Sequence, residues 1–161
     1  MKARLPYRYN NTSRGKRQQA VAAALMLFAR ALSDYGMSAN KINEWVALVL
    51  EATNEVAGTV GNCFANKTWQ DELAYWGEQH GFDFPKEYKL YIRGVAPAGG
   101  EQMFLLLLEL YALTKMGYGE LRLKKILAKY AEISDLYGGG VSKYTRIQLE
   151  EWCGEKGVCL C

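Results

Sequence analysis

The chain has 161 residues, of which 50% are hydrophobic and 23% are charged. This length fits one compact domain or two small units that share a core, and it excludes a large multidomain enzyme. The composition excludes a disordered or collagen-like chain. A single histidine excludes most catalytic and metal sites that are built from several histidines.

Charge is unevenly distributed along the chain, although the net charge is only +3. Residues 1–33 hold seven bases and no acid, and the remaining 13 bases are set against 17 acids. A basic segment on a mildly acidic body suits contact with phosphate or with an acidic protein surface; a solvated terminus that binds nothing is the alternative. Because aromatic rings among bases can stack on nucleobases or anchor an interface, the candidate contact residues are Arg4, Tyr7, Arg8, Tyr9, Arg14, Lys16 and Arg17.

The basic start and the apolar run at 20–29 imitate a secretory signal. The run holds only ten residues before Arg30, and it has a counterpart later in the chain. We therefore interpret it as a helix of the fold. No stretch reaches the roughly 18 uninterrupted apolar residues that a membrane span needs, so we expect a cytoplasmic protein.

An internal repeat is the strongest signal in the sequence. Shifted by 81 residues, positions 31–60 align without a gap on 112–141, with seven identities. A shift of 76 aligns the apolar residues around Trp76 with those around Trp152. We predict a tandem duplication of one helical unit, organised as a basic N-terminal arm at 1–17, a first repeat at 18–84, a linker at 85–100 and a second repeat at 101–161.

Each repeat is predicted to contain three helices. The first, at 18–34 and 101–115, is apolar almost all round and is expected to be buried. Gly36 and Gly117 are predicted to end it, because glycine adopts the left-handed conformation of a helix C-cap without a side-chain clash.

The second helix begins near Ser38 or Gly119 and carries one apolar stripe at helical spacing, at 42, 45, 46 and 49 or at 123, 126, 127 and 130. The third begins at an N-cap residue and ends at a glycine. The proposed limits are Thr68 to Gly81 and Ser142 to Gly157, with Trp76 or Trp152 as the core anchor.

The linker at 85–100 contains Pro85, Pro97 and several glycines, so a helix is not expected there. Residues 89–93 fit either a short strand or an extended connection. We expect the two apolar first helices to meet each other, which gives an all-α, pseudo-symmetric helical body.

A helix, a glycine turn and a second helix also fit a helix-turn-helix that reads duplex DNA. Arg122, Lys125 and Lys129 in the second repeat lie at i, i+3 and i+7 and would form one basic helix face. The corresponding helix of the first repeat carries Glu44, Glu51 and Glu55 in one acidic stripe, which phosphate would repel.

No catalytic motif is present, and we expect no enzyme, cofactor or metal. Cys153, Cys159 and Cys161 lie close together but lack the CxxC-like spacing of a zinc site, and Cys63 is isolated. We expect reduced thiols. His80 precedes Gly81, a position suited to a helix-end cation or a partner for exposed carbonyls.

The segments Leu113–Leu123, Tyr137–Gly140 and Leu149–Trp152, and the opening Met1–Arg8, resemble small helical accessory proteins encoded by phages and prophages of Firmicutes. Those relatives pair a glycine-aromatic-glycine turn with a basic helix, as the second repeat does. The first repeat departs from the pattern, with Gly36-Met37-Ser38 and an acidic helix. The resemblance implies a non-enzymatic phage protein in the bacterial host cytoplasm.

Two functions follow for such a protein. The first is inhibition of a bacterial defence nuclease, as anti-CRISPR proteins do, with Glu44, Glu51 and Glu55 imitating DNA phosphate in a basic channel of the nuclease or of its nucleic-acid complex. This is our hypothesis from the sequence. The alternative is a phage transcriptional regulator that binds double-stranded DNA through the arm and Arg122, Lys125 and Lys129. A structural module that forms homodimers is a third interpretation.

Overall fold

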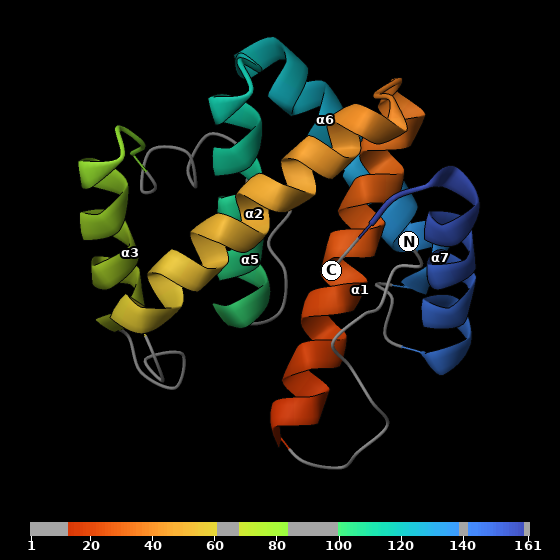
Figure 1. Ribbon diagram of the computed structural model, residues 1–161, viewed down its shortest axis with the longest axis horizontal. Coiled ribbons are helices and arrows are strands. Elements are labelled where there is room, and N and C mark those ends of the chain that lie inside the picture. The colour runs from red at the N-terminus through yellow and green to blue at the C-terminus, as the bar shows by residue number, and fades with distance from the viewer. Residues whose placement is uncertain (1–12, 61–67, 84–99, 139–141, 160–161) are drawn as a thin grey trace. The chain divides into compact units, whose positions relative to one another are not determined.

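The computed structural model describes residues 13–60, 68–83, 100–138 and 142–159, and all regular structure in these ranges is helical (Figure 1). This confirms the expected all-α class. The helices are α1 (Ser13–Tyr35), α2 (Ala39–Val60), α3 (Thr68–Gln79), α5 (Gly100–Lys115), α6 (Glu120–Leu136) and α7 (Lys143–Lys156).

The first helix begins at Ser13, five residues before the predicted start at Gln18. The prediction placed the start near the beginning of the apolar run, but the preceding Arg, Lys and Gln residues are themselves good helix formers. Arg14, Lys16 and Arg17 therefore lie in α1 and not in an arm. The remaining candidates of the arm, Arg4, Tyr7, Arg8 and Tyr9, lie outside the described residues, as does the 89–93 segment.

Glycine turns end the first helix of each repeat, as predicted. Gly36 has φ +114° and Gly117 has φ +94°, values that residues with a Cβ rarely adopt. The hydrogen bonds correspond too. The amide N of Met37 donates to the carbonyl of Leu32 at 3.0 Å, and the amide N of Tyr118 donates to the carbonyl of Leu113 at 3.1 Å. Both bonds are of the type that closes a helix C-terminus.

The third helix of each repeat also ends as predicted. The amide N of Phe82 donates to the carbonyl of Gly77 at 2.8 Å, and that of Val158 to the carbonyl of Cys153 at 2.9 Å. Ser142 is the N-cap of α7, since its Oγ accepts a 3.1 Å bond from the amide N of Thr145. Thr68 differs from the prediction, because it is the first residue of α3 rather than its N-cap.

The chain divides into two compact units, each of which takes helices from both predicted repeats. Unit 1 is Met1–Val46 with Glu120–Cys161, and unit 2 is Ala47–Gly119. Unit 1 therefore holds α1, the start of α2, α6 and α7, whereas unit 2 holds the rest of α2, α3 and α5.

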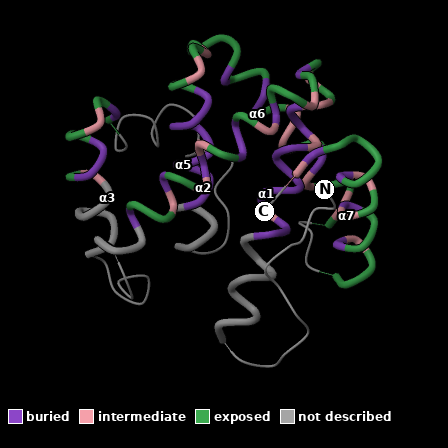
Figure 2. Tube along the Cα trace, viewed as in Figure 1, coloured by how far each residue is buried: buried purple, intermediate pink, exposed green. Residues whose placement is uncertain are grey.

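In unit 1, α1 packs against α6 and α7. Phe28, which is fully buried, stacks on Trp45 with 5.2 Å between ring centroids and lies 5.3 Å from the ring of Tyr130. The purple segments of α1 in Figure 2 follow its buried side chains. Further residues of this core include Met26, Leu32, Leu123, Ile126, Leu127, Ile133, Leu149 and Cys153.

In unit 2, every residue of α5 from Leu105 to Leu113 is buried, as the apolar composition of this helix predicts. Tyr111 meets both Trp76 and Phe82 edge to face, with ring centroids 5.1 and 5.4 Å apart. Such edge-to-face pairs are favourable beyond the area they bury. Trp76 is thus the core anchor that the sequence predicted, while its counterpart Trp152 in unit 1 is only half-buried.

Candidate functional site

A basic face on α6 is the first candidate site, and it lies in unit 1. The helix buries Leu123, Ile126, Leu127 and Ile133. With the apolar side held by the core, Arg122, Lys124 and Lys125 are exposed, and Lys129 is half-exposed. The predicted residues Arg122, Lys125 and Lys129 thus lie on one face of the helix, whereas Lys124 points to a different side.

Ion pairs within α6 moderate the charge of its lysines. Lys124 Nζ lies 3.3 Å from Glu120, four residues earlier, and Lys129 Nζ lies 3.6 Å from Glu132. Exposed pairs of this kind contribute only about 0.3–0.5 kcal/mol. A phosphate can therefore compete with the carboxylate for either lysine.

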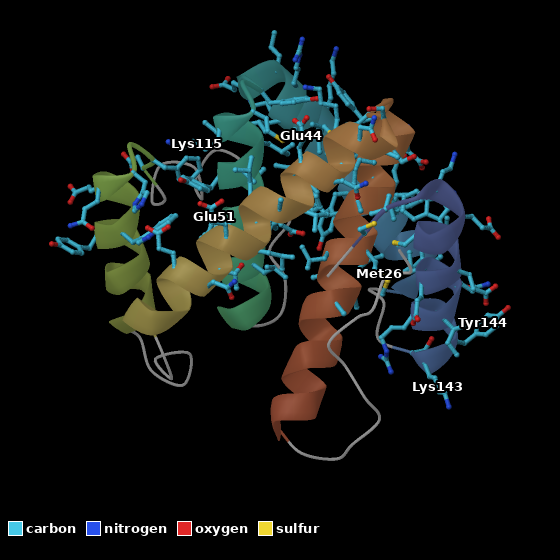
Figure 3. All side chains as sticks on the ribbon, viewed as in Figure 1. Met26, Glu44, Glu51, Lys115, Lys143 and Tyr144 are labelled. Atoms are coloured by element: carbon cyan, nitrogen blue, oxygen red, sulfur yellow. The ribbon has the colours of Figure 1, made fainter. Side chains whose placement is uncertain are left out.

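Exposed aromatic and apolar groups on unit 1 were missed by the sequence analysis. Tyr144 and Leu121 are 70% and 76% exposed. Figure 3 shows Lys143 and Tyr144 extending outward from the start of α7. The exposure of Tyr144 could have been found from the helical period of α7. Leu149 and Cys153 define the buried side of this helix, and Tyr144 does not lie on that side.

Arg30 belongs to the basic first part of the sequence, but it is a structural residue of unit 1. Its Nη1 donates a 3.2 Å bond to the hydroxyl of Tyr137, and its Nε lies 3.4 Å from the carboxylate of Asp34. The guanidinium also lies over the ring of Trp152, 5.1 Å from the centroid. These contacts join α1 to the end of α6 and to α7.

The acidic candidates of α2 have different surroundings. Glu44, in unit 1, is exposed and lies 3.7 Å from Lys41. Glu51, in unit 2, is also exposed (Figure 3). Glu55 is engaged within unit 2, because its Oε1 accepts a 3.2 Å bond from Trp76 Nε1 and lies 2.8 Å from His80 Nε2. Sequence spacing alone could not separate Glu55 from the other two.

His80 lies just past the end of α3, where the sequence predicted a partner for exposed carbonyls. Its Nδ1 is 2.8 Å from the carbonyl O of Trp76, and its ring stacks on the Trp76 ring with centroids 4.0 Å apart. The Nζ of Lys115 donates to the His80 carbonyl at 3.1 Å. Since both ring nitrogens of His80 contact acceptors, neither is available to bind a metal or to act as a general base.

Burial also perturbs the pKa of Glu109 in unit 2 and that of Cys153 in unit 1. Glu109 is 1% exposed within α5 of unit 2, and burial raises the pKa of its carboxyl well above the ordinary range. Burial, with a smaller contribution from Glu150, raises the pKa of Cys153 to about 12. An unreactive thiol results, because the thiolate is the nucleophile and metal ligand.

Among the described residues, no three His, Cys, Asp or Glu side chains gather so that they could hold a metal ion. Cys63 and Cys161 lie outside those residues. Nor does any helix of the described ranges combine the length and apolar composition needed to cross a membrane. Comparison with family models, curated proteins and solved structures finds no match for this chain.

Proposed function

We propose that this chain is a DNA-binding protein whose α6 contacts the phosphate backbone of a duplex. The observation that supports this function is the exposure of Arg122 and Lys125, with Lys129 half-exposed, on one face of a helix whose apolar side is fixed in the core of unit 1. Duplex DNA carries about one negative charge per 1.7 Å of axis, so several closely spaced bases can each neutralise a phosphate. Arg14, Lys16 and Arg17 on α1 add to the basic charge of the same unit.

The proposal concerns backbone contact rather than base reading. Phosphate contacts fix the position of a protein on DNA but carry no sequence information themselves. In the host cytoplasm, such a protein would act as a phage transcriptional regulator. The resemblance to small phage proteins implies a non-enzymatic accessory protein, and regulation is one of the two functions that suit it. This ranks DNA binding above nuclease inhibition, because Glu55 of the acidic stripe is engaged by Trp76 and His80.

Charge reversal on α6 tests the proposal. Fluorescence anisotropy with a labelled duplex of about 25 base pairs, at fixed salt, should show at least a tenfold loss of affinity for the double variant Arg122→Glu with Lys125→Glu. The control variant Lys41→Glu with Lys156→Glu changes the net charge equally at exposed positions away from α6. It should lose less than twofold. Equal losses of affinity in the two double variants would show that only the net charge matters and would contradict a site on α6. Absence of DNA binding by the wild type would contradict the function.

Inhibition of a defence nuclease is the second candidate, supported by the exposed carboxylates of Glu44 and Glu51 on α2. A basic nucleic-acid channel in the nuclease would attract such carboxylates. The variant Glu44→Lys with Glu51→Lys should then abolish inhibition of guided cleavage. The matched control Glu151→Lys with Glu155→Lys, which reverses two exposed acids of α7, should retain it. Full cleavage in the presence of wild-type protein would contradict this candidate.

We infer further that the chain is a tandem duplication whose repeats have exchanged their first helices. Unit 1 combines α1 and the start of α2 with the second and third helices of the second repeat, and unit 2 combines α5 with the rest of α2 and with α3. Corresponding positions make corresponding contacts. Arg30 aligns with Tyr111 at a shift of 81, and Trp152 aligns with Trp76 at a shift of 76. In unit 1 Arg30 lies 5.1 Å from the ring of Trp152, and in unit 2 the ring of Tyr111 lies 5.1 Å from that of Trp76.

Cleavage between the repeats tests the exchange. A site-specific protease sequence inserted between Asp83 and Gly100 allows the folded chain to be cut once. Exchanged helices predict that the two fragments stay together in size-exclusion chromatography, since each unit needs helices from both. Two fragments that separate and remain helical would contradict the exchange. A dimer of intact chains with neither DNA binding nor inhibition would favour the structural module.

A further inference from the structure

We propose that Glu55 and His80 form a pH-sensitive tie that fastens the end of α3 to α2 within unit 2. His80 follows the last residue of α3, and Glu55 lies on α2. The Nε2 of His80 is 2.8 Å from Oε1 of Glu55, which also accepts the 3.2 Å bond from Trp76 Nε1. The same carboxylate oxygen of Glu55 is therefore contacted by Trp76, near the end of α3, and by His80, just after it.

The geometry selects the protonated form of the histidine. Its Nδ1 lies 2.8 Å from the carbonyl O of Trp76, and its Nε2 lies 2.8 Å from the carboxylate of Glu55. A carbonyl and a carboxylate both accept hydrogen bonds, so only the imidazolium, with N–H at both nitrogens, can donate to both at once. Loss of one proton leaves a nitrogen lone pair facing an oxygen. Histidine is the residue type that commonly changes charge between pH 5 and 8.

Charged groups of two helices surround the ring. Glu51 and Glu55 on α2 are the acids, and both act electrostatically on Tyr111 of α5, whose ring centroid lies 6.5 Å from that of His80. Lys115, at the end of α5, is the base, and its Nζ donates to the His80 carbonyl (Figure 3). Glu55 is in direct contact with the ring, since its Oε1 lies 2.8 Å from Nε2.

The corresponding corner of unit 1 is closed without such a pair. The repeat shifts place Leu136 at the position of Glu55 and Lys156 at that of His80, and both residues are exposed. The helix end nevertheless forms, since Val158 is buried there just as Phe82 is in unit 2. The tie is therefore an addition specific to unit 2 rather than a requirement of the fold. This step relies on the repeat correspondence proposed above.

Breaking the tie has two consequences for unit 2. Trp76 is only 4% exposed, and it loses the imidazole that stacks on its ring. The carboxylate of Glu55, which accepts the hydrogen bond from Trp76, is also no longer held in place by His80. Glu55 loses the neutralising cation and becomes a second uncompensated carboxylate close to Glu51. Raising the pH through the titration of His80 thus loosens α3 and makes this side of α2 more acidic.

The test uses the fact that the chain has a single histidine, which gives one set of imidazole resonances. Ring ¹⁵N shifts of the full chain should show protons on both nitrogens at low pH. As the ring titrates, the hydrogen-exchange protection of the α3 amides at 74–79, corrected for intrinsic rates, should fall at least tenfold, while α6 keeps its protection. Unchanged α3 protection through the titration would overturn the proposal.

Two variants separate the tie from other titrations. His80→Lys places a permanent cation opposite Glu55, so α3 protection should become independent of pH over the range in which the wild type changes. Glu55→Gln removes the charge but keeps an amide oxygen for Trp76, and its protection should be low and flat. Glu109→Gln should retain the wild-type step. A step that persists in both His80→Lys and Glu55→Gln, or disappears in Glu109→Gln, would contradict the tie.

Discussion

Arg30 and Trp152 form a cation–π contact in unit 1, with the guanidinium carbon 5.1 Å from the ring centroid. The same guanidinium donates to the hydroxyl of Tyr137 at 3.2 Å. One side chain of α1 therefore holds both α7 and the residue that follows α6. The sequence predicts that the bases of the first 33 residues form a binding feature. Arg30, which is one of them, instead stabilises the fold.

Replacing Arg30 by Met should destabilise the protein by about 1–2 kcal/mol, because the stem is kept while the cation–π contact and the hydrogen bond to Tyr137 are lost. Urea unfolding followed by circular dichroism measures the change. Lys125→Met, at an exposed position of α6, is the control and should stay within about 0.5 kcal/mol of the wild type. Equal effects of the two changes would show that the Arg30 contacts contribute nothing.

Glu109 should make the stability fall as the pH rises. Burial raises its pKa in the folded chain, so the folded state holds a proton that the unfolded state releases. The contribution is fully present below about pH 4.3, the ordinary value for glutamate, and is lost as the pH rises through the raised pKa. The difference in unfolding free energy between wild type and Glu109→Gln, measured from pH 4 to 8, should therefore shift in favour of the variant. A difference independent of pH would contradict this.

Cys153 should resist alkylation in the folded protein. Its pKa is raised from 9.0 to about 12, which lowers the thiolate fraction near pH 8 by about a thousandfold, and the thiolate is the species that reacts. Cys159 is half-exposed and should react first. Iodoacetamide labelling followed by peptide mass spectrometry compares the two sites, with the denatured chain as control. Equal rates in the folded protein would be inconsistent with a buried Cys153.

Gly36→Ala and Gly117→Ala should each cost roughly 1–2 kcal/mol of stability, because both glycines have positive φ and a Cβ is strained in that conformation. No atom lies within 4 Å of the added Cβ at either position, so the cost is purely conformational. Gly154→Ala provides the control. It lies inside α7 with open space around it and should stabilise the helix by about 0.5–1 kcal/mol. Thermal unfolding of the three variants tests both signs.

Local features of this fold could be predicted from the sequence because their causes are local. Gly36, Gly81, Gly117 and Gly157 mark the ends of helices, and the apolar stripe at 42, 45, 46 and 49 marks a buried helix side, which the structure confirms. The start of α1 could not be read from the apolar pattern, since Arg14, Lys16 and Arg17 are polar helix formers. An apolar stripe shows which side of a helix is buried, but not against which helix it packs.

The candidate sites divide in the same way. The common face of Arg122, Lys125 and Lys129 could be predicted, because it depends only on this segment being a helix, and α6 is one. The acidic stripe required knowledge of the neighbours, because Glu55 meets Trp76 and His80 from a helix that is 21 or more residues away in the sequence. The burial of Glu109 was foreseeable, since α5 is apolar on every side and leaves no solvent-facing position for a carboxylate.

The salt dependence of DNA affinity tests the central proposal most directly. If Arg122, Lys125 and Lys129 on α6 each neutralise a phosphate, log Kobs should fall with log salt concentration with a slope of about −3, at about −0.9 per contact. Lys125→Ala should reduce the magnitude of that slope by about 1, and Lys41→Ala should leave it unchanged. A slope near zero, or one that Lys125→Ala does not alter, would contradict binding through α6.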